Sequence, residues 1–180
     1  MNTKISTLII FGLMTSQLCN SSMAVSASTE KLMIEDAIKN LTTAMYKMDA
    51  SVDKEDYIHA LFVRGKLYME ISDYRRAGSD FREAAMKEED INRSMSSSFW
   101  IMSAYAALMN DDISGFQMRL YSARLVDPSN PDAWYFTAMD LADQEKYDVA
   151  YEYFQKARDL GYAGDVTPEE ESANYVVKNR

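Results

Sequence analysis

The second half of the sequence repeats itself at a spacing of 34 residues, and this repeat limits the possible folds more than any other feature. Three positions of one unit recur in the next, as the pairs Trp100 and Trp134, Ala104 and Ala138, and Ala123 and Ala157. An upstream copy precedes the first of these units by 39 residues, with Leu61, Gly65 and Ala84 at the matching positions. A period of this length is typical of stacked helical hairpins. The repeat therefore predicts an all-α chain and favours binding over catalysis.

The residue types within each unit alternate between large rings and small side chains. The third unit carries Trp134, Ala138, Tyr147, Ala150, Phe154 and Ala157, and the first carries Gly65, Tyr68, Tyr74, Ala77, Phe81 and Ala84. The middle unit keeps Trp100, Ala104, Ala123 and Pro128 but has Phe116 at a small-residue position and Leu120 at an aromatic one. This pattern resembles the tetratricopeptide repeat family, whose unit is a 34-residue helix-turn-helix. The resemblance implies a right-handed α-solenoid of three hairpins over residues 58–91, 97–130 and 131–164.

Segments on either side of the repeats are expected to add helices. Apolar positions between 30 and 50 follow a helical period, so residues 28–57 should form an N-terminal helix and a linker. In the third hairpin we expect helices from Pro131 to Asp143 and from Tyr147 to Leu160, followed by a left-handed turn at Gly161. Residues 165–180 should cap the stack with a short helix from about Pro168 to Val177. The five extra residues near 88–98 either lengthen a turn or extend the following helix by about one turn.

Residues 1–27 have the order of a secretory signal peptide. Lys4 is followed by an apolar run of about ten residues and then by the small residues Val25, Ser26 and Ala27. The alternatives are an uncleaved anchor, a buried helix, or cleavage after Ala24. Leu18 before Cys19 argues against a lipid anchor. We therefore expect an exported protein of the periplasm or the extracellular space, with no membrane insertion and no cysteine in the mature chain.

Charge and composition exclude several functional classes. Removal of residues 1–27 leaves 18 basic and 28 acidic residues, a net charge of −10, which is unsuited to nucleic acid. His59 is the only histidine, and the sequence contains no nucleophile elbow, phosphate-binding loop or zinc motif. The pairs Asp111/Asp112 and Asp140/Asp143 are best interpreted as a helix cap and a solvated helix face. We expect no catalytic residue, metal or cofactor.

The family resemblance implies a concave groove lined by the first helix of each hairpin. Its ligand-facing positions recur at spacings of three, four and three, which place mostly apolar and aromatic residues in the groove. The predicted contact residues are Phe62, Lys66, Met69, Ile101, Tyr105, Met109, Tyr135 and Met139. Alternatively, the N-terminal helix, the C-terminal segment or a second copy of the chain covers these residues.

The predicted function is therefore non-covalent binding of another protein or peptide. Methionine and tyrosine suit an amphipathic helix or an extended apolar segment, here one with basic flanks. The roles considered are an adaptor, a scaffold or a chaperone-like holder for an envelope or secreted protein. A secretion chaperone of the three-repeat type and a subunit of an envelope enzyme are the alternatives, and a homodimer is possible.

Overall fold

The computed structural model describes residues 27–48 and 54–178, and this part of the chain is helical with no strand. The prediction of an all-α chain is confirmed for these residues. The helices are α1 (Ala27–Lys47), α2 (Lys54–Glu70), α3 (Tyr74–Glu88), α4 (Arg93–Met109), α5 (Ile113–Val126), α6 (Pro131–Asp143), α7 (Tyr147–Asp159) and α8 (Pro168–Lys178). The predicted signal peptide lies outside the described residues, except for Ala27 at its end.

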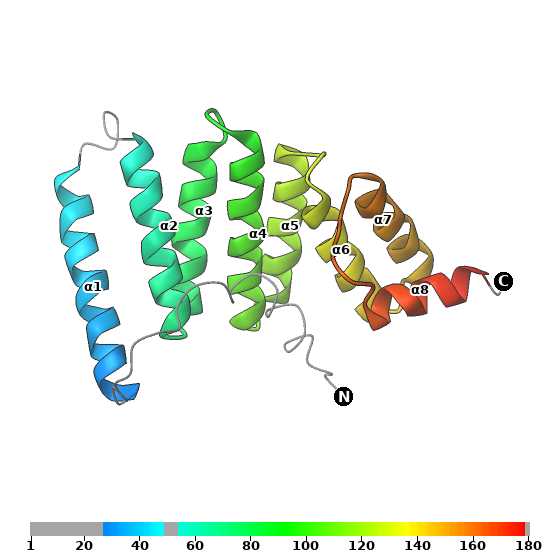
Figure 1. Ribbon diagram of the computed structural model, residues 1–180, viewed down its shortest axis with the longest axis horizontal. Helices are drawn as coiled ribbons and strands as arrows, with labels where there is room; N and C mark the ends of the chain where they lie inside the picture. The colour runs from blue at the N-terminus through cyan, green and yellow to red at the C-terminus, as the bar shows by residue number, and fades with distance from the viewer. Residues whose placement is uncertain (1–26, 49–53, 179–180) are drawn as a thin grey trace.

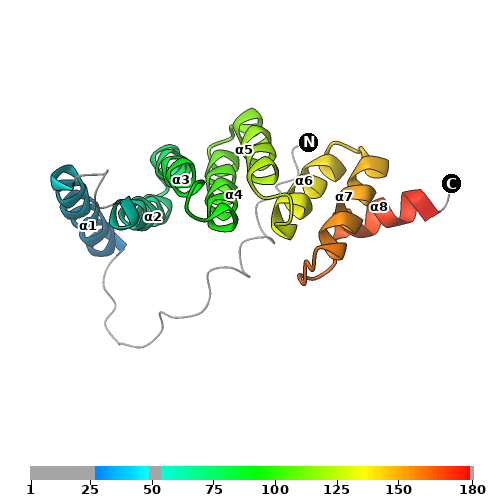
Figure 2. The same cartoon turned by 90° about the horizontal axis from the view of Figure 1, so that it is seen from above.

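The helices form a row in which each packs against the next in the chain (Figure 1). Two contacts depart from this order: α8 contacts α6 as well as α7, and α4 contacts α6. Seen along the helices, α2 and α4 lie toward one side of the row, and α3 and α5 lie toward the other (Figure 2). The row therefore has one face formed by α2 and α4 and an opposite face formed by α3 and α5.

Polar side chains cap the N-termini of α3, α4, α5 and α6. Asp73, Asn92, Asp112 and Asn130 each accept a backbone N–H from the first turn of the helix that follows. Such a bond satisfies a donor that has no partner within the helix. Gly161 adopts the left-handed conformation, with a φ of 96°, as predicted for the turn after α7.

The extra residues before the second hairpin extend a helix. The repeat spacing predicted a start near residue 97, but α4 begins at Arg93 and runs for 17 residues. Its N-cap, Asn92, follows a short turn after α3. The insertion therefore adds about one turn to α4, which is the second of the two expected outcomes.

Small residues facing large ones fill the interior between the helices. In the third hairpin Ala138, Ala150 and Ala157 surround the fully buried ring of Phe154. In the middle hairpin Phe116 and Leu120 pack against Ala104 and Ala107. The two residues that depart from the repeat pattern are thus both buried, and the bulk of Phe116 is accommodated by alanines on α4.

Three serines of α4 are buried and bind neighbouring backbone carbonyls. The hydroxyl of Ser96 donates to the carbonyl of Ala85 at 2.8 Å, and that of Ser103 donates to the carbonyl of Gly78 at 2.7 Å. On the other side of α4, Ser97 donates to the carbonyl of Ala123 at 2.9 Å. Buried hydroxyls need such partners because desolvation without one is costly. These bonds join α4 to α3 and to α5.

A pair of glycine substitutions tests how tightly α2 and α3 pack. A Cβ on Gly65 would lie 2.7 Å from Cε1 of Phe81, whose ring is buried, whereas a Cβ on Gly78 would meet its nearest atom at 3.4 Å. We expect Gly65→Ala to lower the free energy of unfolding by about 1–2 kcal/mol, because overpacking outweighs the gain in helix propensity. Gly78→Ala should be neutral or stabilising by up to about 1 kcal/mol. Urea unfolding followed by circular dichroism measures both, and a stabilising Gly65→Ala would contradict the packing described.

Candidate functional site

The predicted contact residues of α2 are only partly available at the surface. The ring of Phe62 is half-buried, with its centroid 6.3 Å from that of Phe81 and 5.5 Å from that of Phe99. Lys66 is exposed, and its Nζ lies 5.6 Å from the centroid of Phe62. Met69 is half-buried against the same core. One part of the Phe62 ring therefore packs in the core, and another part is exposed at the surface.

The predicted contact residues of α4 have a similar intermediate exposure. Ile101, Tyr105 and Met109 are each half-buried. Ile101 packs against the cluster that holds Ala104 and Phe116. Burial raises the pKa of the Tyr105 hydroxyl, so this group stays neutral at ordinary pH. These side chains offer apolar surface without charge.

The predicted contact residues of α6 are covered by the chain's own C-terminal segment. Tyr135 is 1% exposed and Met139 is 5% exposed. The ring of Tyr162 stacks on Tyr135 with centroids 3.7 Å apart, and the Tyr135 hydroxyl donates to the carbonyl of Asp165 at 3.2 Å. The hydroxyl of Thr167 donates to the sulfur of Met139 at 3.1 Å. In this structure Tyr135 and Met139 thus contact residues 162–167 rather than an open surface.

An ion pair holds that covering segment in place. Nη2 of Arg158 lies 2.6 Å from Oε2 of Glu170, and its Nε donates to Oε1 at 3.1 Å. The guanidinium also lies 5.6 Å from the ring centroid of Tyr135 and 5.2 Å from that of Tyr162. The hydrogen bond to Glu170 raises the pKa of Arg158, and burial raises the pKa of Tyr162 to about 12. The Arg158 guanidinium therefore stays charged and the Tyr162 hydroxyl stays neutral at ordinary pH.

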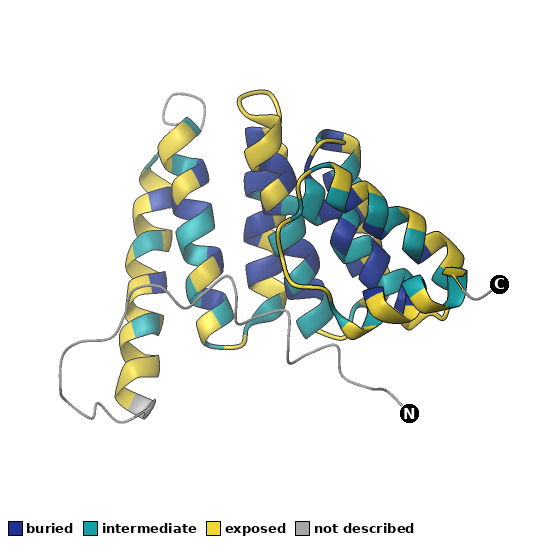
Figure 3. Cartoon of the chain, turned by 45° about the vertical axis from the view of Figure 1, so that its right-hand side comes forward, coloured by how far each residue is buried: buried dark blue, intermediate teal, exposed yellow. Residues whose placement is uncertain are grey.

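An apolar hollow of about 420 Å³ remains open between α2 and the first half of α4. We call it the α2–α4 hollow. Its apolar lining consists of Phe62, Met95, Phe99 and Met102, and its polar lining consists of Asn92, Ser94 and Ser98. Figure 3 shows that exposed residues also run along α1, whereas buried residues concentrate on the helices in the middle of the row. In this hollow, apolar surface is both concave and accessible.

The sequence identified one side of this hollow and missed the other. Phe62 was predicted from the repeat positions, and Ser98 occupies a position of the same pattern. Met95 and Met102 were not predicted, because Met95 lies in the added first turn of α4 and Met102 lies outside the repeat's ligand-facing positions. The five extra residues before the second repeat unit are the sequence signal that could have indicated Met95, because they form the added first turn of α4.

The titratable residues singled out from the sequence have structural roles or are exposed. Asp112 caps α5 by accepting the N–H of Gly115 at 2.9 Å, and this bond lowers its pKa. Asp140 accepts from Gln117 and Gln144, while burial raises its pKa. His59 is exposed on α2. Within residues 27–48 and 54–178, no group of acidic, histidine or cysteine side chains is arranged to hold a metal ion.

The chain was also compared with known proteins. No protein-family model matches it, and no curated protein matches it. Among the described helices, none is long and apolar enough to cross a bilayer.

The ion pair between α7 and α8 can be tested by removing one charge. Glu170→Gln should lower the free energy of unfolding by about 1–3 kcal/mol, because Arg158 loses a charge-assisted partner in a mostly buried position. Glu171→Gln is the matched control, since Glu171 is exposed on the same turn. Its effect should stay within about 0.5 kcal/mol. Equal urea midpoints and slopes for the two variants would show that the ion pair does not hold the segment.

Proposed function

We propose that the chain is a non-catalytic protein–protein interaction module that binds a segment of another protein in the α2–α4 hollow. The hollow itself carries this proposal. It combines a concave shape, an apolar floor that includes Phe62 and Met102, and a polar rim. Sites that bind a ligand are usually concave and mostly apolar with a few polar groups, as this one is.

The architecture we propose for the module is a right-handed α-solenoid of tetratricopeptide-like hairpins. The support is the repeat of 34 residues together with a row of helices in which each packs against the next, so that the three repeat units correspond to α2/α3, α4/α5 and α6/α7. In such a stack the first helix of each hairpin lines the binding face. The α2–α4 hollow lies between two of these first helices.

The chemistry of the hollow selects the bound segment. Methionine side chains adapt to irregular apolar partners, so Met95 and Met102 favour an amphipathic helix or an extended apolar segment. The chain has a net charge of −9, which favours basic residues on either side of that segment. The order of residues 1–27 supports export, so we propose an adaptor, scaffold or chaperone-like holder for an envelope or secreted protein.

The covered end of the row limits the extent of the contact surface. Tyr135 and Met139 are buried under residues 162–167, so the proposed contact surface is confined to α2 and α4. The half-buried residues Ile101, Tyr105 and Met109 extend it along α4. A partner segment of a few helical turns would match this length.

Two methionine substitutions test this surface. Met95 and Met118 are both exposed, at 47% and 64%, but only Met95 lines the hollow. A panel of amphipathic peptides with basic flanks should bind the chain, and Met95→Lys should weaken binding about tenfold because a charge enters the apolar floor. Met118→Lys adds the same charge on α5 and should change affinity by less than about twofold.

Fluorescence anisotropy of labelled peptides gives both dissociation constants. Equal weakening by the two variants would show that net charge rather than the hollow governs binding. Failure of every peptide to bind would count against the proposed class of partner.

A further inference from the structure

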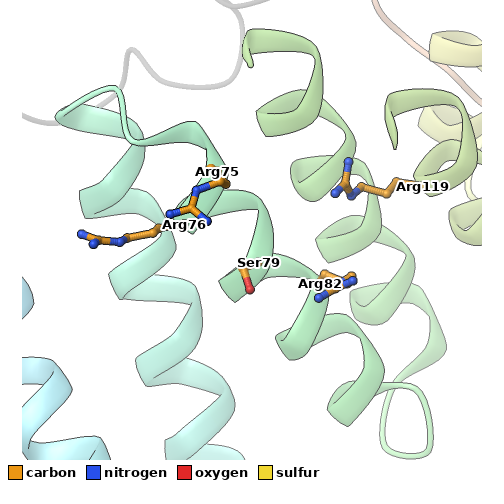
Figure 4. A pocket seen from close by; sticks show the side chains of 5 residues that line it. All are labelled: Arg75, Arg76, Ser79, Arg82 and Arg119. Atoms are coloured by element: carbon orange, nitrogen blue, oxygen red, sulfur yellow. The ribbon is translucent and has the colours of Figure 1, made fainter. Parts of the chain in front are cut away.

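A second hollow, of about 320 Å³, lies on the α3 and α5 side of the row and is lined almost entirely by arginine. Its lining residues are Arg75, Arg76, Ser79 and Arg82 of α3 and Arg119 of α5. Figure 4 shows the side chain of Arg119 reaching from its own helix toward those of α3. We call this the arginine hollow.

The concentration of positive charge is unusual for this chain. The sequence has nine arginines and a net charge of −9, yet four of the nine line one hollow. Two of the three carboxylates of α3 are engaged elsewhere, since Asp80 forms an ion pair with Arg64 at 2.8 Å and Glu83 accepts from the hydroxyl of Tyr57 at 3.3 Å. The third, Glu88, is buried at the far end of the helix. The local field is therefore positive within an otherwise acidic chain.

The arginines of this hollow retain unused hydrogen-bonding capacity. Among the described residues, neither Arg75 nor Arg82 has a carboxylate within 4.0 Å. Arg76 and Arg119 each have one carboxylate contact, and both are long, at 3.4 Å. The Nε of Arg119 is buried and has no hydrogen-bond partner. A bound anion would offset the positive charge gathered along this hollow and would satisfy these donors.

We propose that the arginine hollow binds a phosphate-bearing ligand with two or more negative charges. A carboxylate carries one charge and two oxygens, whereas a phosphoryl group brings up to two charges and three acceptor oxygens to match several guanidinium forks. The hydroxyl of Ser79 supplies one more donor. This site is separate from the α2–α4 hollow and does not depend on it.

Isothermal titration with pyrophosphate at low ionic strength tests the site on the purified chain. The double variant Arg75→Ala/Arg82→Ala should bind pyrophosphate at least about tenfold more weakly, because two unpaired charged donors are lost. Arg93→Ala is the matched control, since Arg93 is an exposed arginine outside the hollow, and it should change affinity by less than about twofold. Circular dichroism shows whether the variants are folded.

A second arm distinguishes the source of the phosphate. Vesicles of phosphatidylcholine with phosphatidic acid present the same group on a lipid, and their binding is measured by co-sedimentation with each variant. If the double variant loses pyrophosphate binding but keeps vesicle binding, the result supports a soluble ligand. If the double variant loses vesicle binding, the result supports a lipid headgroup. The proposal is overturned if the double variant and Arg93→Ala behave alike with both probes. It is also overturned if citrate or polyglutamate binds as tightly as pyrophosphate, because the site would then select charge without phosphate.

Discussion

The close approach of α4 to its two neighbours is the constraint on which the rest of the described structure depends. A serine hydroxyl reaches the carbonyl of an adjacent helix only when the two backbones are near each other, and α4 makes this bond to α3 through Ser96 and Ser103 and to α5 through Ser97. A Cβ on Gly78 would meet its nearest atom, Cβ of Ala106 on α4, at 3.4 Å, so the approach leaves room for no more than a small side chain there. The α2–α4 hollow is lined in part by α4, and the arginine hollow is lined by α3 and α5, the two helices that α4 contacts. The position of α4 therefore sets the width of the apolar hollow on one side and the distance between α3 and α5 on the other.

The sequence predicted the helices well because their signals are local. Proline at the first position of α6 and of α8, the polar cap before α5, and glycine after α7 all act within a few residues of the helix end. The buried serines of α4 were not predicted, since a run of serines is typical of turns and their carbonyl acceptors lie on other helices. The arginine hollow was missed for a related reason. Arg82 and Arg119 are 37 residues apart in a chain whose overall charge is negative.

The sequence left open what covers Tyr135 and Met139, because a repeat pattern does not say what covers a surface. In the repeat pattern, Tyr135 and Met139 have the same positions whether the C-terminal segment is docked on them or free. The segment is docked through interactions that the repeat does not contain, namely the stack of Tyr162 on Tyr135 and the ion pair of Arg158 with Glu170. An aromatic pair and a mostly buried ion pair each stabilise by about 1 kcal/mol or more. Together they offset part of the conformational entropy that is lost when the connection before α8 is ordered.

The two proposed sites have opposite preferences for charge, yet they need not interfere with each other. A basic-flanked segment on the α2 and α4 side and a phosphate on the α3 and α5 side would be separated by roughly the 10 Å diameter of a helix. This distance exceeds the Debye length of about 8 Å at physiological salt, so direct attraction between the ligands through solvent would be weak. Coupling between the sites would therefore have to pass through α4, the helix that contacts both α3 and α5. Because α4 is held by hydrogen bonds on both sides, a shift large enough to open one hollow would break bonds that shape the other.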